Sequence, residues 1–229
     1  MNRGVREIEP ELWVVDRPLP LRVGDLGTRM TVIRLSNGHL FLHSPVALDN
    51  DLQSALDELG PVCHVVGPST VHHLFLGDYT FAYPDAVLWG ARGLAAKRKD
   101  LTFQEELAND SGAHWGDEIV AHVFGGFVVN EVVFFHPATR TLVLTDLAFN
   151  VTHQSRNEAK LFHWLVGAKG HFGPHRLIRI GILDRAAARA SLEEILDWDF
   201  DRVIVTHGDV LESGGKEKMR GAFDYLLGP

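Results

Sequence analysis

The sequence has few of the features that would narrow its function at once. Its 229 residues include one cysteine, Cys63, which excludes an internal disulfide and favours a reducing compartment. No segment approaches the roughly 18 consecutive apolar residues of a membrane span, and the N-terminus shows no signal-peptide core. The formal net charge of -8 argues against a nucleic-acid or anionic-membrane partner. We therefore expect a cytoplasmic protein that acts on a small-molecule substrate or ligand.

Two catalytic motifs are missing as well. Ser44 follows a predicted strand but lacks the Gly-x-Ser-x-Gly turn of serine hydrolases. The segment 65–70, VVGPST, lacks the glycines and the lysine that a phosphate-binding loop needs. The sequence also shows no repeat, low-complexity tract or linker. One domain over residues 1–229 is the economical prediction.

Short apolar runs separated by turn signals predict many strands, followed by alternating helices and strands. The predicted strands cover residues 8–16, 64–68, 86–89, 118–123, 127–135, 142–144 and 202–208, with a hairpin over 28–46. The predicted helices cover 49–59, 154–169, 184–198 and 216–227. Residues 92–116 are predicted as a helix and a surface loop, and 176–182 as a strand or the approach to a helix. This order suits either two sheets packed face to face or one open mixed sheet.

Several candidate metal ligands follow predicted strands, where α/β proteins place their chemistry. His72 and His73 form a pair in a loop, His207 follows the apolar run VIV, and Asp146 ends the second strand of a hairpin. Imidazole and carboxylate groups are the ligands of zinc, manganese and iron(II). The alternatives are structural: packing or capping roles for the histidines, and a helix-capping role for Asp146.

Other residues have weaker claims to a functional role. Glu131 precedes an apolar strand and either orients a ligand histidine or is a solvated strand-end acid. His136 lies in a hairpin turn before a proline and is interpreted either as structural or as a residue that supports a metal ligand. His163, His171 and His175 cluster with aromatic residues and either line a pocket or belong to an amphipathic surface.

Two segments carry a resemblance to a known family. EVVFFHPATRTLVLTDLAF (131–149) resembles the strand pair that ends in the metal-bridging aspartate of the metallo-β-lactamase superfamily. SLEEILDWDFDRVIVTHGDV (191–210) resembles the helix and strand that deliver its last histidine ligand. The likeness runs from about Trp13 to the C-terminus. Together with TRMTVIRL and HSPV, it points to a little-characterised bacterial branch. It implies an α/β fold, an αββα sandwich of two mixed sheets with external helices.

The resemblance also implies a ligand set. It places the bridging aspartate at Asp146 and the last histidine at His207. HVVGPSTVHHLF (64–75) corresponds to the His-x-His-x-Asp-His loop but matches it only in part, with His73 on the final histidine and His72 on the aspartate. Four further family positions carry other residues here: Pro68, Thr70, Phe127 and Ser44. The prediction is one divalent metal, zinc before manganese or iron, held by His72, His73, Asp146 and His207.

Three hypotheses follow for the function. The first is a hydrolase that activates water on the metal against an ester, lactone, thioester or phosphodiester, with Asp146 and His73 as its catalytic residues. The second is a non-catalytic protein that has lost its metal and binds a ligand or partner in the same cleft. The third is iron-based oxygen chemistry. The aromatic segment 79–83 is a candidate contact for a homo-oligomer.

Overall fold

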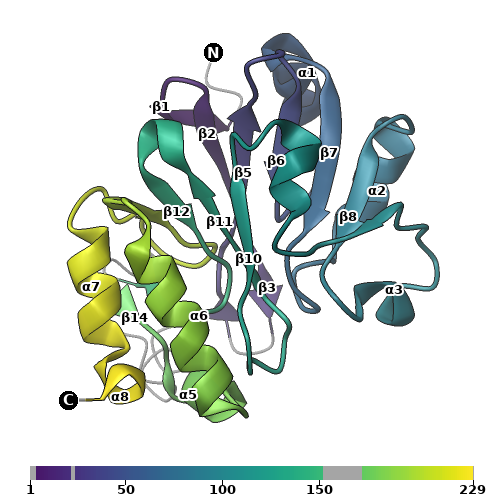
Figure 1. Cartoon of the computed structure of the whole chain (residues 1–229). Helices are drawn as coiled ribbons and strands as arrows, with labels where there is room; N and C mark the ends of the chain where they lie inside the picture. The colour runs from purple at the N-terminus through teal and green to yellow at the C-terminus, as the bar shows by residue number, and fades with distance from the viewer. Residues whose placement is uncertain (1–3, 22–23, 152–171, 229) are drawn as a thin grey trace.

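The computed structural model describes residues 4–21, 24–151 and 172–228, and its main feature is a pair of sheets (Figure 1). The larger sheet consists of β1 (Val5–Glu9), β2 (Leu12–Arg17), β5 (Thr28–Arg34), β6 (Leu40–His43), β7 (Val62–Gly67), β8 (Val87–Gly90) and β9 (Glu105–Glu106), in that order. The smaller sheet consists of β10 (Val120–Val123), β11 (Val132–His136), β12 (Thr141–Val143) and β15 (Arg202–Ile204). Two further two-stranded sheets pair β3 (Pro20–Leu21) with β4 (Gly24–Asp25) and β13 (Phe149–Asn150) with β14 (Phe172–Gly173), both antiparallel.

Helices cover the outer face of each sheet (Figure 1). On the larger sheet these are α1 (Asn50–Leu59), α2 (Leu76–Ala82) and α3 (Leu94–Lys97). On the smaller sheet they are α5 (Arg176–Gly181), α6 (Arg185–Asp197), α7 (Gly215–Ala222) and α8 (Asp224–Leu227). The 3₁₀ turns η1 (Ser111–Trp115) and η2 (Pro137–Thr139) lie in connections. Asp49 and Asp184 cap α1 and α6 as the sequence predicts, because their carboxylates accept first-turn N–H groups.

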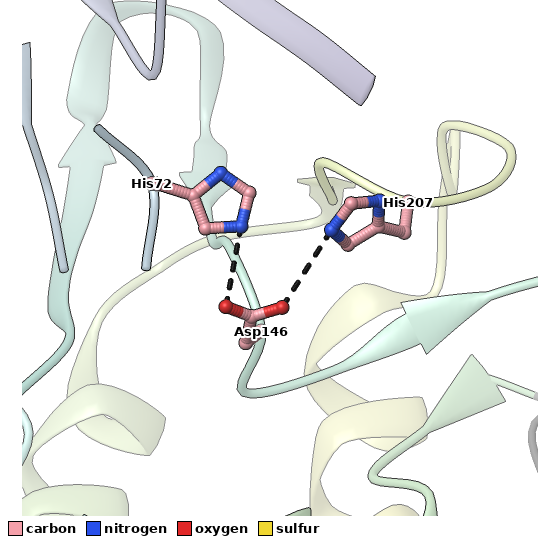
Figure 2. Close-up of side chains that lie close together, drawn as sticks. All are labelled: His72, Asp146 and His207. Atoms are coloured by element: carbon pink, nitrogen blue, oxygen red, sulfur yellow. Dashed lines mark ion pairs between the residues drawn. The ribbon is translucent and has the colours of Figure 1, made fainter. Parts of the chain in front are cut away.

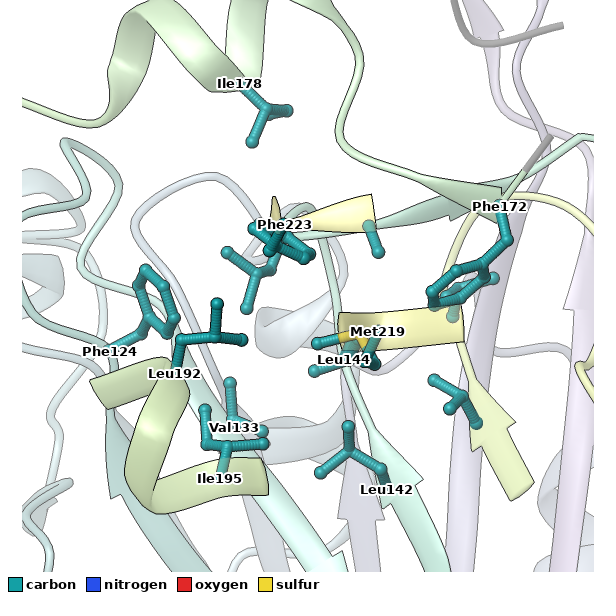
Figure 3. Packing of buried hydrophobic residues seen from close by; sticks show 14 of the residues in the cluster. Phe124, Val133, Leu142, Leu144, Phe172, Ile178, Leu192, Ile195, Met219 and Phe223 are labelled. Atoms are coloured by element: carbon teal, nitrogen blue, oxygen red, sulfur yellow. The ribbon is translucent and has the colours of Figure 1, made fainter. Parts of the chain in front are cut away.

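The alternation of side chains along each strand divides the core into layers. In β6, Phe41 points between the two sheets, whereas Leu40 and Leu42 pack under the outer helices. The ring of Phe41 lies 5.5 Å from that of Phe134 on the opposite sheet, edge to face. A third cluster, shown in Figure 3, fills the space between the smaller sheet and α5 to α8. Three apolar layers between four structural layers make an αββα sandwich, as predicted.

Two parallel strand pairs determine where the loops meet. β6 pairs with β7 in parallel, and β12 pairs with β15 in parallel. Since parallel strands end at the same edge of a sheet, the loops that follow these four strands gather at one edge of the sandwich.

Several sequence predictions need correction. The strand expected at 8–16 is a hairpin, because the chain turns at Glu11 with a φ of 66° and β1 pairs antiparallel with β2. Phe127 lies in a loop before β11 rather than in the strand. The closing helix is interrupted at Phe223 and forms α7 and α8. Residues 176–181 are helical. The helix predicted at 154–169 lies outside the described residues.

The aromatic segment 79–83 and the helices bear on two possible contacts, one with a second copy of the chain and one with a membrane. In the aromatic segment 79–83, Tyr79 is fully buried and Phe81 is exposed. No helix in the described part of the chain has both the length and the apolarity that crossing a membrane would require.

Candidate metal site

Three of the predicted ligands converge at one edge of the sandwich (Figure 2). One ligand atom from each of His72, Asp146 and His207 lies within 4.8 Å of the other two. The Nε2 atom of His72 is 3.2 Å from Asp146 Oδ2, and the Nε2 atom of His207 is 3.6 Å from Asp146 Oδ1. All three side chains are largely buried. Two imidazoles facing one carboxylate form a donor set suited to a divalent transition metal.

Each member comes from a loop that follows a strand. His72 follows β7, Asp146 follows β12 and His207 follows β15. The hydroxyl of Ser69 accepts hydrogen bonds from the backbone N–H groups of Val71 and His72, which fixes the first loop. No helix begins at Asp146, so the helix-capping alternative for this residue does not apply.

His207 is held in one orientation and one tautomer. Its Nδ1 atom lies 2.7 Å from the carbonyl oxygen of Gly27, so Nδ1 carries the proton and donates it. Nε2 then presents a lone pair to Asp146. The ring of Phe149 stacks on the imidazole at 5.1 Å, and burial lowers the pKa of His207 to about 4. A neutral, fixed imidazole is the form that binds a metal.

His72 is oriented by Ser44. The Oγ atom of Ser44 lies 2.9 Å from His72 Nδ1, which leaves Nε2 facing the carboxylate. Burial by itself favours the neutral ring, but the charges of Asp146 and Glu131 raise the pKa of His72. Ser44 has a φ of 54°, which is uncommon for a residue other than glycine and turns its side chain towards the site.

Asp146 carries a buried oxygen without a hydrogen bond. Within the described residues, its Oδ2 atom accepts none, although His72 Nε2 is 3.2 Å away. Burial alone favours the neutral acid, whereas the interaction with the imidazole of His72, and more weakly with that of His207, lowers the pKa of Asp146. A buried, ionised oxygen without a donor is costly unless another charge compensates it. The residues present therefore fit a cation between the imidazoles and the carboxylate.

Glu131 holds the loop that carries Asp146. This fully buried carboxylate accepts three backbone hydrogen bonds, from Thr145 at 2.6 Å, Asp146 at 2.9 Å and Leu147 at 2.8 Å. Burial, with the nearby charge of Asp146, raises the pKa of Glu131 to about 7. Its contacts are with the backbone of the Asp146 loop rather than with a ligand histidine or solvent. Both sequence interpretations of Glu131 are therefore corrected.

His73 is not part of the three-residue group. Its Nδ1 atom lies 3.3 Å from the guanidinium of Arg98, which also donates to the His73 carbonyl oxygen. Burial and the charges of Lys97 and Arg98 lower the pKa of His73. Because Arg98 has no acceptor to offer, His73 receives a hydrogen bond at Nδ1 there. The structure thus brings together three of the four predicted ligands.

The remaining histidines have other surroundings. His136 is buried at the end of β11, where Nδ1 lies 2.8 Å from the Thr139 hydroxyl, consistent with its structural interpretation. His175 caps α5 and packs against Phe149 at 4.6 Å, close enough for its charge to lower the pKa of Asp146. Its position beside the site depends on the β13–β14 pairing, which the sequence does not reveal. His163 and His171 lie outside the described residues.

The group opens into a cleft of about 130 Å³. The polar lining consists of Thr28, Ser44, His72, His73, Asp146 and His207, and the apolar lining of Leu19, Pro45, Val71, Leu74 and Phe75. Asp146 is the one carboxylate among these lining residues.

Comparison with known protein families assigns the sequence to one of them. The sequence model of the domain of unknown function DUF4336 matches residues 9–164, which is more than half of the chain. The chain belongs to the DUF4336 family. No curated protein matches its sequence.

Solved structures show which fold this DUF4336 protein has. The metallo-β-lactamase from Pontibacter korlensis aligns with a TM-score of 0.68 and 12% identity over 98% of this chain and 99% of its own. FIM-1 from Pseudomonas aeruginosa, in its mono-zinc form, aligns at 0.67 and 12% over 98% and 96%. The enzyme from Hirschia baltica aligns at 0.66 and 11% over 98% and 97%. The protein therefore has the metallo-β-lactamase fold, in a branch divergent in sequence.

Proposed function

We propose that this DUF4336 protein is a metal-dependent hydrolase with one divalent ion held by His72, Asp146 and His207. The fold and the convergence of these side chains support the proposal, and three of the four predicted ligands take part in it. Zinc is the favoured ion, since two imidazoles and one carboxylate form a ligand set of catalytic zinc sites and FIM-1 was solved in a mono-zinc form. Manganese and iron(II) accept the same donors.

The observation that carries the proposal is the state of the Asp146 carboxylate. Its Oδ2 atom is buried and faces His72 Nε2 at 3.2 Å, yet accepts no hydrogen bond from any described residue. A structural His–Asp pair would be expected to align a donor with this oxygen. The Nε2 atoms of His72 and His207 converge on the two oxygens of one buried carboxylate, and a divalent cation bound between them would replace the proton that the pair otherwise shares.

The protein's own groups have distinct tasks in such a reaction. When bound, a divalent metal lowers the pKa of its water towards neutrality and polarises a carbonyl or phosphoryl oxygen. Gly27 and Ser44 hold the two imidazoles with Nε2 facing the site. Asp146, as the one carboxylate lining the cleft, is the group positioned to receive a proton from the attacking water. The substrate class is an ester, lactone, thioester or phosphodiester.

Metal content tests the proposal directly. The protein would be purified without a histidine tag or added metal and analysed by mass spectrometry, beside Asp146→Ala and His207→Ala. About one equivalent of metal in the wild type, lost in both variants, is the expected result. His136→Ala is the matched control, because it removes a buried histidine that is part of a different set of contacts.

A different result would favour the non-catalytic alternative. No metal in a folded wild-type protein, even after incubation with zinc, manganese or iron, would contradict the hydrolase proposal. The departures from the family pattern at Pro68, Thr70, Phe127 and Ser44 would then mark a binding protein on an enzyme fold. Iron with oxygen consumption would instead indicate redox chemistry.

A further inference from the structure

The mouth of the metal cleft has an exposed apolar side. Val71 is 42% exposed and Leu74 is 59% exposed, and both line the cleft together with Leu19. They flank the histidine pair in the same loop, so the side chain of His72 turns inward while these two remain at the surface. Large apolar side chains are ordinarily buried, and an exposed cluster beside a reactive site indicates a binding surface.

The loop that carries these residues is anchored at several points. Both the N–H group and the hydroxyl of Thr70 donate to the carbonyl oxygen of Val129, at 2.9 and 3.1 Å. The amine of Lys97 donates to the Thr70 carbonyl oxygen, and Arg98 donates to that of His73. Val71 and Leu74 are therefore held at the surface by bonds on both sides of them. A preformed apolar surface binds a ligand with little additional ordering cost.

Charge is distributed unevenly around the cleft. Asp146 is the one carboxylate among the residues that line the cleft, whereas Leu19, Val71 and Leu74, called here the apolar wall, line it with aliphatic side chains. An apolar part of a substrate can contact this wall while the bond to be cleaved lies over the three candidate ligands. Pockets that combine an apolar wall with a few convergent polar groups are typical of small-molecule sites.

We propose that the substrate is a carboxylic ester or thioester whose acyl group is an aliphatic chain lying against Leu19, Val71 and Leu74. The proposal rests on the hydrolase function proposed above and specifies its substrate class. In the reaction, water adds to the acyl carbon and the bond from that carbon to the alcohol or thiol sulfur breaks. Of the two protons of the water, one goes to the leaving alkoxide or thiolate and the other is released to solvent, and the acyl chain departs as a carboxylate.

Binding of the product series tests the apolar wall without requiring turnover. Acetate, butanoate, hexanoate and octanoate would be titrated into the purified protein by calorimetry. Each methylene transferred from water to an apolar surface contributes up to about fourfold in affinity, so octanoate is expected to bind at least about tenfold more tightly than butanoate. The p-nitrophenyl esters of the same acids would be assayed in parallel for kcat/KM.

Two variants test whether the dependence of affinity on chain length arises from the apolar wall formed by Leu19, Val71 and Leu74. Leu74→Ser and Val71→Ser should reduce the ratio of octanoate to butanoate affinity, and the corresponding ratio of kcat/KM, by about threefold or more. Phe81→Ser is the matched control, because Phe81 is an apolar side chain of 91% exposure on α2 that does not line the cleft. Its chain-length ratio should equal that of the wild type. Circular dichroism and melting temperature would confirm that all variants are folded.

The outcomes separate the two proposals. Affinity that does not rise with chain length, or a ratio unchanged in both Leu74→Ser and Val71→Ser, would overturn the apolar-wall inference even if esters were hydrolysed. Affinity that rises with chain length and falls in the variants, without hydrolysis of any of the p-nitrophenyl esters, would support the apolar wall and overturn the assignment of a carboxylic ester substrate, while absence of bound metal would contradict the hydrolase function itself.

Discussion

The buried carboxylate of Glu131 gives a prediction that joins stability to metal binding. Replacing Glu131 with Ala removes the acceptor of three backbone N–H groups in the loop that carries Asp146. Replacing it with Gln keeps one acceptor oxygen and places an amide N–H₂ against at least one of the donors. We expect Glu131→Ala to lose both stability and metal, and Glu131→Gln, which keeps one acceptor oxygen, to lose less of each.

The magnitude follows from the contacts. An orphaned buried N–H group costs about 1–3 kcal/mol, so three of them cost on the order of 3–9 kcal/mol before any water enters. Against this, a pKa raised from 4.5 to about 7 corresponds to about 3 kcal/mol for keeping the ionised carboxylate buried. The expected net loss for Glu131→Ala at pH 8 is therefore roughly 0–6 kcal/mol, with a central value of about 3 kcal/mol.

The same raised pKa predicts a dependence on pH. The folded protein holds a proton on Glu131 that the unfolded chain releases above pH 4.5. The stability of the wild type relative to Glu131→Gln should therefore fall as pH rises from about 4.5 through about 7, by about 3 kcal/mol in total. Urea denaturation of metal-free protein at pH 5 and pH 8 measures this difference.

A surface carboxylate provides the control. Glu118 also accepts a backbone hydrogen bond, from Ser36 at 2.8 Å, but it does so at the surface. Glu118→Gln should change stability by less than about 1 kcal/mol and leave the metal content unchanged. If Glu131→Ala bound metal with wild-type affinity and unfolded at the wild-type urea concentration, the supporting role of Glu131 would be refuted.

Three further predictions concern other buried groups. His43 is fully buried, both of its ring nitrogens lack partners among the described residues, and burial lowers its pKa to about 3. As the pH falls from 6.5 to 3, the unfolded chain takes up a proton that the folded protein does not, so the free energy of unfolding of the wild type should fall by on the order of 5 kcal/mol relative to His43→Leu. Urea titrations measure this difference. Gly208 has a φ of 104°, and a Cβ there would lie 2.2 Å from the Asn150 carbonyl oxygen, so Gly208→Ala should lower the melting temperature and the metal content together, whereas Gly221→Ala, in open space, should not. Removing the metal with a chelator should destabilise the wild type by about 2.7 kcal/mol relative to protein with free metal at a hundred times its Kd, and an unchanged calorimetric transition would contradict a bound ion.

The local elements were largely accessible from sequence. The Ser36-Asn37-Gly38 turn between apolar runs predicts the β5–β6 hairpin, and the caps Asp49 and Asp184 predict the starts of α1 and α6. These signals operate over a few residues, so the sequence carries them in full. Where local signals conflict, prediction fails: the strand predicted over residues 8–16 extends from the apolar residues 12–15 back across Pro10 and Glu11, where the chain turns.

The candidate site was only partly accessible from sequence. The strand-end positions of Asp146, His72 and His207 mark them as functional residues, because loops at the ends of parallel strands meet. Only the tertiary structure separates His72 from its neighbour His73, since the direction of each side chain depends on Ser69, Thr70 and Arg98 rather than on spacing along the chain. A pair of adjacent histidines in a loop has no fixed periodicity from which their directions could be derived.

Hydrophobic periodicity and turn residues in the sequence predicted the order of the elements but left two architectures open, and the resemblance of two segments to a known family selected the αββα sandwich. The tertiary structure decided what surrounds each polar group: three N–H donors for Glu131, a carbonyl for His207, a hydroxyl for His72 and no hydrogen bond for Asp146 Oδ2 among the described residues. These partners are far apart in sequence, as with Gly27 and His207. Hydrogen bonds and desolvation depend on distances of a few ångströms between such segments, and only the folded chain fixes those distances.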